Sequence, residues 1–198
     1  MVDYNKIFSH NRRWARRKRT LNPGFFKKHF TKQKPDFLYI GCSDSRVSIE
    51  KLMGVDIGEV FVHRNIANIV SPDDDNVKAV IQYAVDVLKV EHIVVAGHTG
   101  CGGIKASLGE EQKGAIGTWL QNIKSVYVKH KSELELFENE PEMLDEFSKL
   151  NALEQCKNIL SLPCVTKSKE KTGFPIIHAW IYNMANGHLN DLGFEAEK

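Results

Sequence analysis

The strongest constraint on the fold is an alternation of buried strands with an amphipathic helix over residues 36–98. The apolar run "DFLYIGC" covers residues 36–42, and the segment 58–65 is rich in β-branched and aromatic residues. Residues 76–90 place apolar side chains at three- and four-residue intervals, as amphipathic helices do, and "HIVVAGH" follows at 92–98. Strands that alternate with helices in this way predict a parallel α/β sheet.

The rest of the chain completes one domain around that sheet. Residues 1–34 read as an N-terminal helical arm, 35–110 as the α/β core, and 111–198 as a helical region that ends in a late strand at 174–184. "ANG" at 185–187 predicts a turn and an edge hairpin. We therefore expect an α/β fold with a mainly parallel central β-sheet and an antiparallel edge strand, flanked by helices.

Composition limits the function classes. The chain has 198 residues, of which 27 are basic and 25 acidic, so its net charge of +2 gives no argument for nucleic acid or a membrane as partner. No run approaches the roughly 18 apolar residues of a membrane span, and the N-terminus lacks the apolar core of a secretory signal. The four cysteines are expected to be reduced, and we predict a soluble, cytoplasmic protein.

Residues that can ligate a metal follow two of the predicted strands. Cys42 and Asp44 come after the first strand, and His98 and Cys101 come after the third. Ligands of an open α/β sheet gather at the carboxyl ends of its strands, so these side chains are expected to meet. Two thiolates and one imidazole suit Zn²⁺, and we predict that Cys42, His98 and Cys101 bind it.

Other roles for these cysteines are possible from the sequence alone. A nucleophilic cysteine assisted by His98 is one alternative, but it leaves the second thiol without a role. Cys156 and Cys164 lie in the helical region without a neighbouring histidine or carboxylate pattern, and we interpret them as structural thiols.

At these residues the sequence resembles the bacterial-type β-class carbonic anhydrases. The family's blocks occur in their usual order as "CSDSRV" at 42–47, "FVHRNIAN" at 61–68, "QYAVDVLKV" at 82–90 and "GHTGCGG" at 97–103. The paired "CxDxR" and "HxxC" blocks are highly specific together, and the resemblance runs across nearly the whole chain.

The resemblance implies a zinc enzyme that reversibly hydrates CO₂ to bicarbonate and a proton through zinc-bound hydroxide. Each subunit is expected to hold one Zn²⁺ on Cys42, His98 and Cys101, with Asp44 either paired with Arg46 or bound to zinc as a fourth ligand. The family's substrate pocket maps onto Gln33, Phe61, Ile66, Tyr83 and Gly102. It also implies a homo-oligomer, a dimer or tetramer, whose N-terminal helices embrace a partner subunit.

The aspartate and arginine suit a positioning role beside the metal. Asp44, when paired with Arg46, can accept a hydrogen bond from the hydroxide and direct its lone pair towards CO₂. If the pair breaks, Asp44 displaces the water. We therefore expect a pH-linked gate, with activity that rises on the alkaline side.

The sequence departs from the family at a second, inhibitory bicarbonate site found in some bacterial members. Arg64 and Tyr182 match plausible members of that site, but Tyr39 stands where the family has a tryptophan. Two competing interpretations also remain. One keeps the zinc but changes the substrate to carbonyl sulfide or carbon disulfide, and the other makes the zinc purely structural, with Asp44 closing its fourth position.

Overall fold

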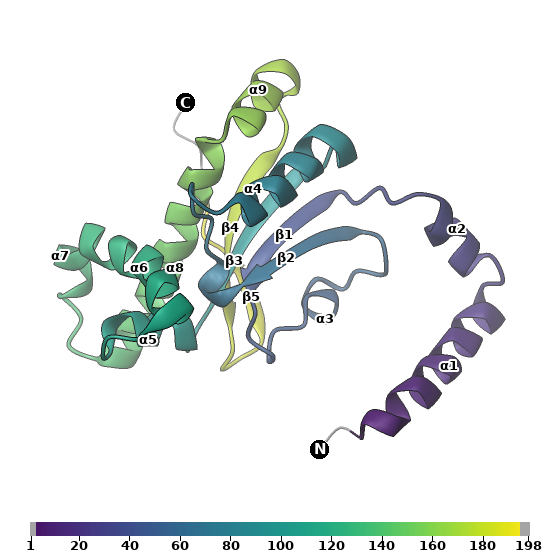
Figure 1. Cartoon of the computed structure of the whole chain (residues 1–198), viewed down its shortest axis with the longest axis horizontal. Coiled ribbons are helices and arrows are strands. Elements are labelled where there is room, and N and C mark those ends of the chain that lie inside the picture. The colour runs from purple at the N-terminus through teal and green to yellow at the C-terminus, as the bar shows by residue number, and fades with distance from the viewer. Residues whose placement is uncertain (1–2, 195–198) are drawn as a thin grey trace. The chain divides into compact units, whose positions relative to one another are not determined.

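The computed structural model describes residues 3–194 and divides the chain into two compact units, Met1–Lys34 and Pro35–Lys198. The first unit consists of α1 (Tyr4–Leu21) and α2 (Phe25–Thr31), the helices expected for the N-terminal arm (Figure 1). The division of the remaining chain at residue 110 stays a prediction.

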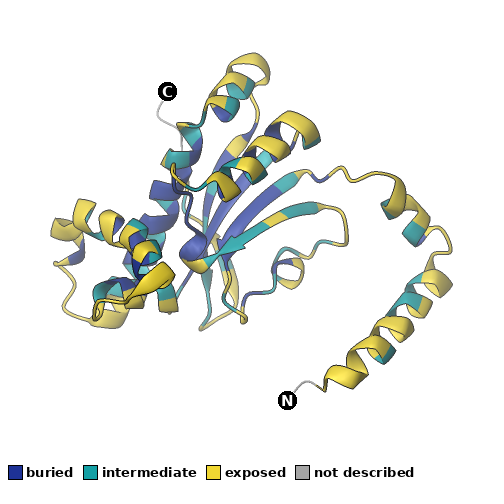
Figure 2. Ribbon diagram, viewed as in Figure 1, coloured by how far each residue is buried: buried dark blue, intermediate teal, exposed yellow. Residues whose placement is uncertain are grey.

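The two helices of the first unit bury little of their apolar surface. The Asp3 side chain caps α1 by accepting the N–H of Asn5 at 3.0 Å, and the rings of Trp14 and Phe26 meet edge-on at 5.7 Å. No residue of α1 is buried, and Phe30 of α2 is 90% exposed (Figure 2). Exposed aromatic side chains of this kind are typical of surfaces that pack against a partner.

The second unit is built on a five-stranded sheet with the order β2-β1-β3-β4-β5. Its strands are β1 (Phe37–Cys42), β2 (Val60–Asn65), β3 (His92–His98), β4 (Ile176–Asn183) and β5 (His188–Asp191). All neighbours pair in parallel except β4 and β5, which are antiparallel. The predicted fold class, a mainly parallel sheet with an antiparallel edge strand, is confirmed.

Helices cover the sheet and extend beyond its carboxyl edge (Figure 1). They are α3 (Ile49–Met53), η1 (Ile66–Asn68), α4 (Asp75–Gln82), η2 (Tyr83–Leu88), α5 (Gly102–Leu108), α6 (Gly114–Lys129), α7 (Lys131–Leu134), α8 (Glu140–Leu160) and α9 (Pro163–Thr172). Within residues 3–194, none of the helices has both the length and the apolar character that crossing a membrane requires.

One face of the sheet carries the main core. Leu38, Ile40, Ile93 and Val95 alternate along β1 and β3 towards this face, as period-two burial requires. They pack against buried side chains of α4, η2, α8 and α9 (dark blue in Figure 2). A second cluster lies among α5, α6, α7 and α8 and includes Cys42 and Cys101, so the ends of the strands are covered by packed helices. The two sulfurs at these strand ends are therefore buried, whereas Arg46 in the loop after β1 reaches solvent.

The helix predicted over residues 76–90 is interrupted. It begins as the α-helix α4 and continues as the π-helical segment η2, which ends where Lys89 adopts a left-handed backbone (φ +59°). The N–H of Val90 donates to Ala84 O at 3.1 Å across this end. Ala84 and Val85 are buried by the widened turn. Apolar periodicity does not distinguish an α-helix from a short π-helical segment, so the sequence could not reveal this change.

A nearly buried carboxylate ties α8 to α6 and α7. Glu154, whose side chain is 9% exposed, accepts hydrogen bonds from Lys129, His130 and Lys157, the last at 2.7 Å. Burial alone would raise the pKa of Glu154, but these hydrogen bonds outweigh it and lower the pKa from 4.5 to about 2. The ionised carboxylate therefore stabilises the fold at neutral pH.

We predict that Glu154→Gln destabilises the protein on the order of 3 kcal/mol at pH 7. Because the folded-state pKa is depressed, this contribution is present above the unfolded value of 4.5 and is lost as pH falls towards 2. Urea unfolding of both proteins between pH 7 and pH 3 should show the difference shrinking. The exposed Glu170→Gln serves as control, and a difference that does not change with pH would contradict the assignment.

Candidate metal centre

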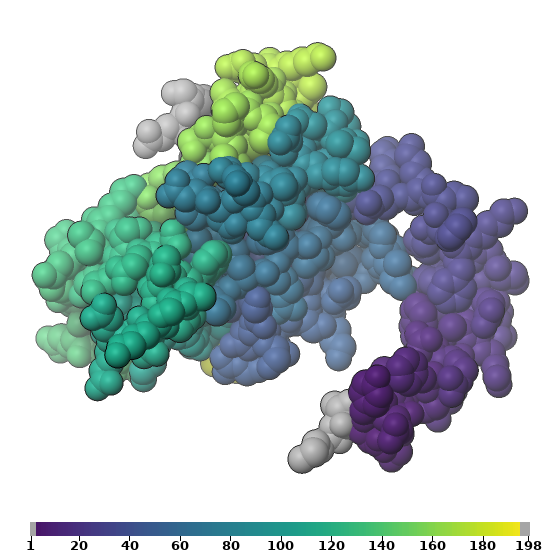
Figure 3. Space-filling model, in the orientation of Figure 1, coloured from purple at the N-terminus to yellow at the C-terminus, as the bar shows by residue number. Residues whose placement is uncertain are grey.

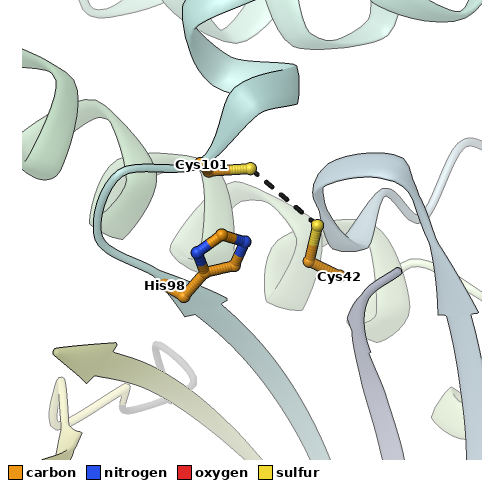
Figure 4. Close-up of side chains that lie close together, drawn as sticks. All are labelled: Cys42, His98 and Cys101. Carbon is orange, nitrogen blue, oxygen red and sulfur yellow. Dashed lines mark hydrogen bonds between the residues drawn. The ribbon is translucent and has the colours of Figure 1, made fainter. Parts of the chain in front are cut away.

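Parallel pairing of β1 with β3 brings their carboxyl ends to one edge of the sheet. Cys42 is the last residue of β1, and His98 is the last residue of β3. The chain then turns through Thr99 and Gly100, and Cys101 precedes the first turn of α5. In Figure 4 the side chains of Cys42, His98 and Cys101 point towards one another.

The three side chains have the geometry of a metal site. The sulfurs of Cys42 and Cys101 are 3.9 Å apart, and one ligand atom from each of the three residues lies within 4.8 Å of the others. All three residues are buried, and His98 Nε2 has no hydrogen-bond partner among the described residues. A buried nitrogen facing two thiols is satisfied by a cation, and this donor set is one that Zn²⁺ prefers. Cys42, His98 and Cys101 therefore have the donor atoms and the spacing that the predicted Zn²⁺ site needs.

The electrostatics of the two thiols also call for a cation. The hydrogen bond from Cys101 is the main cause that lowers the pKa of Cys42, to about 4. The same contact with Cys42, reinforced by burial, raises the pKa of Cys101. Because two buried thiolates so close repel each other, the pair retains one proton unless a positive charge lies between them. A bound divalent ion lets both sulfurs ionise.

The backbone fixes which nitrogen of His98 faces the sulfurs. His98 Nδ1 lies 3.0 Å from the carbonyl oxygen of Thr99, and since a carbonyl only accepts, Nδ1 carries the hydrogen. Burial lowers the pKa of His98, but the neighbouring Cys42 sulfur, the hydrogen bond to the Thr99 carbonyl and the Asp44 carboxylate outweigh it, and the net pKa shift is upward. The lone pair of Nε2 is thereby left for a metal.

A strained turn supports the sulfur of Cys42. Ala67 has a left-handed backbone (φ 61°), and its N–H donates to Cys42 Sγ at 3.4 Å. Trp119 holds this turn by donating to Ile66 O at 2.9 Å, and Asn151 donates to Ala67 O at 2.9 Å. A non-glycine residue persists in this conformation only where its surroundings enforce it. The strained turn therefore directs the N–H of Ala67 at the sulfur of Cys42.

Asp44 is held beside the cluster by Arg46. Arg46 donates from Nε to Asp44 Oδ1 at 2.9 Å and from Nη2 to Asp44 Oδ2 at 2.7 Å, a forked pair. These hydrogen bonds hold the pKa of Asp44 well below its usual range, so it is ionised at neutral pH. Asp44 Oδ2 is 3.9 Å from His98 Nε2. Of the two positions expected for Asp44, the structure has the one paired with Arg46.

Comparison with known proteins identifies the family. A family model described as carbonic anhydrase matches residues 37–189. A carbonic anhydrase of Emericella nidulans is 46% identical over 192 residues, which cover 97% of this chain and 84% of that protein. A tetrameric β-carbonic anhydrase of Sordaria macrospora has a TM-score of 0.93 at 38% identity and covers 98% of both chains. The β-carbonic anhydrase CafA of Aspergillus fumigatus has a TM-score of 0.92 at 32% identity and covers 98% of this chain and 92% of its own.

The chain belongs to the β-carbonic anhydrase family. It is therefore a lyase that hydrates CO₂, with Cys42, His98 and Cys101 as its possible zinc site. The matches to fungal relatives extend the resemblance beyond the bacterial-type members to which the motifs pointed.

The predicted pocket residues of this carbonic anhydrase are only partly brought together by the structure. Phe61 and Tyr83 lie with ring centroids 5.9 Å apart, and Ile66 is 40% exposed. A Cβ added at Gly102 would meet no atom within 4 Å, so the space beside it is open. Gln33 belongs to the Met1–Lys34 unit, and its contribution to the pocket stays a prediction.

The residues predicted for a second bicarbonate site lie on three different strands, Tyr39 on β1, Arg64 on β2 and Tyr182 on β4. Arg64 donates from Nε and Nη2 to Cys42 O at 2.9 and 2.7 Å, and from Nη2 to Asp44 O at 2.8 Å. Tyr39 is buried, which raises its pKa to about 12 although Arg64 acts in the opposite direction. Tyr182 lies on β4, with β3 between it and β1. The role of these residues in regulation stays a prediction.

The remaining two cysteines lie apart from the metal centre. Cys156 is buried and its Sγ donates to His178 O at 3.4 Å. Cys164 is half-buried in a groove of about 830 Å³ between α9 and the α4–η2 segment, which meet on the face seen in Figure 3. Burial raises the pKa of both thiols. The environment of Cys156 suits a packed, structural thiol, whereas Cys164 lines the groove.

Several residues around the site were not found from the sequence. Asn151 and Asp145 both lie on α8, far along the chain from the motifs, yet Asn151 donates to Ala67 O and Asp145 accepts from Gly100 N. Asn151 is 1% exposed, but its helical neighbours Ser148, Glu154 and Gln155 are polar as well, so the pattern did not single it out. Nothing in the local pattern distinguishes Asp145 from the other acidic residues of α8.

We predict that Gly103→Ala destabilises the protein by about 1–3 kcal/mol and weakens zinc binding. A Cβ at Gly103 would lie 2.7 Å from Ile66 Cγ2 and 3.2 Å from Ala67 Cβ, which pushes the turn away from Cys42. Gly102→Ala, one residue earlier and with no atom within 4 Å, is the matched control. Urea unfolding and zinc content measure both effects, and equal results for the two variants would contradict the prediction.

Proposed function

We propose that this β-carbonic anhydrase hydrates CO₂ reversibly at the Cys42–His98–Cys101 centre, with one Zn²⁺ per subunit. The observation that carries the proposal is a buried donor set with an unpartnered His98 Nε2 beside a carboxylate that Arg46 holds out of the cluster. Three protein ligands with the fourth position free are typical of catalytic zinc sites.

When bound, zinc lowers the pKa of a water molecule and so supplies hydroxide near neutral pH. Asp44 is ionised and therefore acts only as a hydrogen-bond acceptor. Its forked pair with Arg46 fixes the direction in which its oxygens accept, so a hydroxyl hydrogen beside the centre is held on Asp44 and the oxygen lone pair faces the substrate. Asp44 and Arg46 thus orient the nucleophile rather than supply it.

The substrate pocket is proposed to lie beside this nucleophile. Phe61, Ile66 and Tyr83 supply apolar surface for an uncharged gas, and the open space at Gly102 admits it. Gln33 is proposed to donate a hydrogen bond to a substrate oxygen.

Two alternatives are separated by their chemistry. A purely structural zinc needs a closed coordination shell, whereas the forked pair of Arg46 with Asp44 disfavours closure. Carbonyl sulfide and carbon disulfide share the linear shape of CO₂ and would enter the same pocket. Assays with both sulfur compounds therefore accompany the CO₂ assay, and turnover of either in place of CO₂ would replace the proposed substrate.

Stopped-flow CO₂ hydration by zinc-loaded and chelator-treated protein tests the proposal directly. We expect activity that is lost with the metal and returns when zinc is added. Full activity in protein shown by elemental analysis to contain no metal would overturn the zinc-dependent mechanism.

We predict that Asp44→Asn retains zinc but lowers turnover about ten- to a hundredfold, because the amide can donate as well as accept and no longer anchors Arg46. Asp73→Asn, an exposed aspartate outside the centre, is the control and should behave as the native enzyme. Zinc content and CO₂ hydration are measured on the same samples. Native turnover in Asp44→Asn would remove this residue from the mechanism.

The gate is proposed to depend on pH. Arg46 holds Asp44 away from the metal position, and hydroxide competes with the carboxylate for that position more effectively as pH rises. Activity of the native enzyme should therefore increase from mildly acid to alkaline pH. A flat profile of CO₂ hydration over this range would argue against a gate at Asp44.

We further propose that the chain assembles as a homodimer or homotetramer through its N-terminal unit. The exposed apolar side chains of α1 and α2, such as Phe8 and Phe30, support this, and the Sordaria macrospora relative is tetrameric. Light scattering should give two or four times the mass of one chain. A monomer at micromolar concentration would contradict the proposal.

A cytoplasmic location is also proposed. All four cysteines are unpaired, and the metal centre needs two of them as reduced thiolates, which a reducing compartment maintains. Fluorescent tagging of the full chain in its source cells tests this location.

A further inference from the structure

The turn between β3 and α5 is held by a residue that the mechanism does not use. Gly100 has a left-handed backbone (φ +64°), and because glycine lacks a Cβ and adopts many backbone conformations, other groups must fix the orientation of its peptides. Its N–H donates to Asp145 Oδ1 at 3.1 Å, and its carbonyl accepts from Arg46 Nη2 at 3.3 Å. Asp145 comes from α8, a helix that packs on β3 and β4.

The peptide unit between Thr99 and Gly100 connects Asp145 to the metal ligand His98. One end of this unit is the Gly100 N–H, which Asp145 accepts, and the other end is the Thr99 carbonyl, which accepts from His98 Nδ1 at 3.0 Å. Thr99 itself is anchored on β4 by its N–H to Tyr182 O at 3.0 Å. The orientation of one peptide plane therefore decides whether His98 keeps its hydrogen-bond acceptor.

We propose that Asp145 is a positioning residue for the metal centre, which acts through the Thr99–Gly100 peptide to fix the ring orientation and tautomer of His98. The inference rests on the proposed zinc site. A carboxylate on the N–H of a peptide polarises that peptide and makes its carbonyl a better acceptor. The stronger hydrogen bond from Nδ1 increases the basicity of Nε2, as acceptors behind ligating histidines do.

The turn at Gly100 also contacts the Asp44–Arg46 pair. Arg46 Nη2 divides its hydrogen bonds between Asp44 Oδ2 at 2.7 Å and the Gly100 carbonyl at 3.3 Å. The Gly100 carbonyl belongs to the next peptide, Gly100–Cys101, so Asp145 and Arg46 hold the two peptides on either side of Gly100.

Three variants on α8 separate a positioning role from general support of the fold. Asp145→Ala removes the acceptor, and Asp145→Asn keeps a weaker, neutral acceptor oxygen. Glu146→Gln is the matched control, because Glu146 pairs with Lys149 at 2.6 Å and is the next residue along the helix. Each protein is loaded with zinc, and its zinc release to a chelator and the ¹⁵N chemical shifts of the His98 ring are measured.

We expect Asp145→Ala to release zinc about ten- to a hundredfold faster than the native protein and to shift the Nδ1 signal of His98. Asp145→Asn should fall between Asp145→Ala and the native protein, and Glu146→Gln should match the native protein. Native zinc release and native His98 signals in Asp145→Ala would overturn the proposal, as would equal effects of the alanine and asparagine variants. If Asp145→Ala does not fold, Asp145→Asn decides, and a result equal to Glu146→Gln overturns the proposal.

These readouts do not depend on turnover. A native protein that binds zinc but does not hydrate CO₂ would refute the proposed function and leave the Asp145 result standing. A native protein with full CO₂ hydration, whose zinc release is unaffected in Asp145→Ala and Asp145→Asn, would refute the role of Asp145 alone.

Discussion

The parallel pairing of β1 with β3 is the constraint on which the rest of the structure depends. Their register, with Gly41 opposite Ala96, ends both strands at the same edge and brings Cys42 and His98 to it. The buried thiols of Cys42 and Cys101, 3.9 Å apart, cannot both ionise without a cation between them. The site therefore favours a metal ion even in the absence of substrate. The helices beyond the edge bury both sulfurs, which keeps them from being stabilised as thiolates by water.

Hydrogen bonds to backbone groups hold the catalytic side chains in place around this centre. Arg64 donates to the carbonyls of Cys42 and Asp44, and Arg46 donates to the Gly100 carbonyl as well as to the Asp44 carboxylate. Arg64 therefore holds the loop after β1, and Arg46 links that loop to the loop after β3. This explains how short, glycine-containing loops keep side chains in fixed positions without large apolar contacts of their own.

The sequence revealed the parts of the molecule that depend on local pattern. The strands, the edge hairpin and the cluster of Cys42, His98 and Cys101 follow from apolar periodicity and from ligand spacing at strand ends. The π-helical segment η2 and the left-handed Ala67 were not predictable, because both are imposed by packing against distant elements. Asp145 was missed for the same reason, since only the folded chain brings α8 to the turn after His98.

The contact between Tyr39 and Gly41 limits how this strand can be redesigned. The ring of Tyr39 fills the volume that a side chain at Gly41 would need, with Cε1 only 2.2 Å from an added Cβ. A side chain at Gly41 therefore requires a shift of the Tyr39 ring or a smaller residue at position 39. An engineer who wishes to introduce another aromatic residue at this place must choose both residues together, or the end of β1 that presents Cys42 will move.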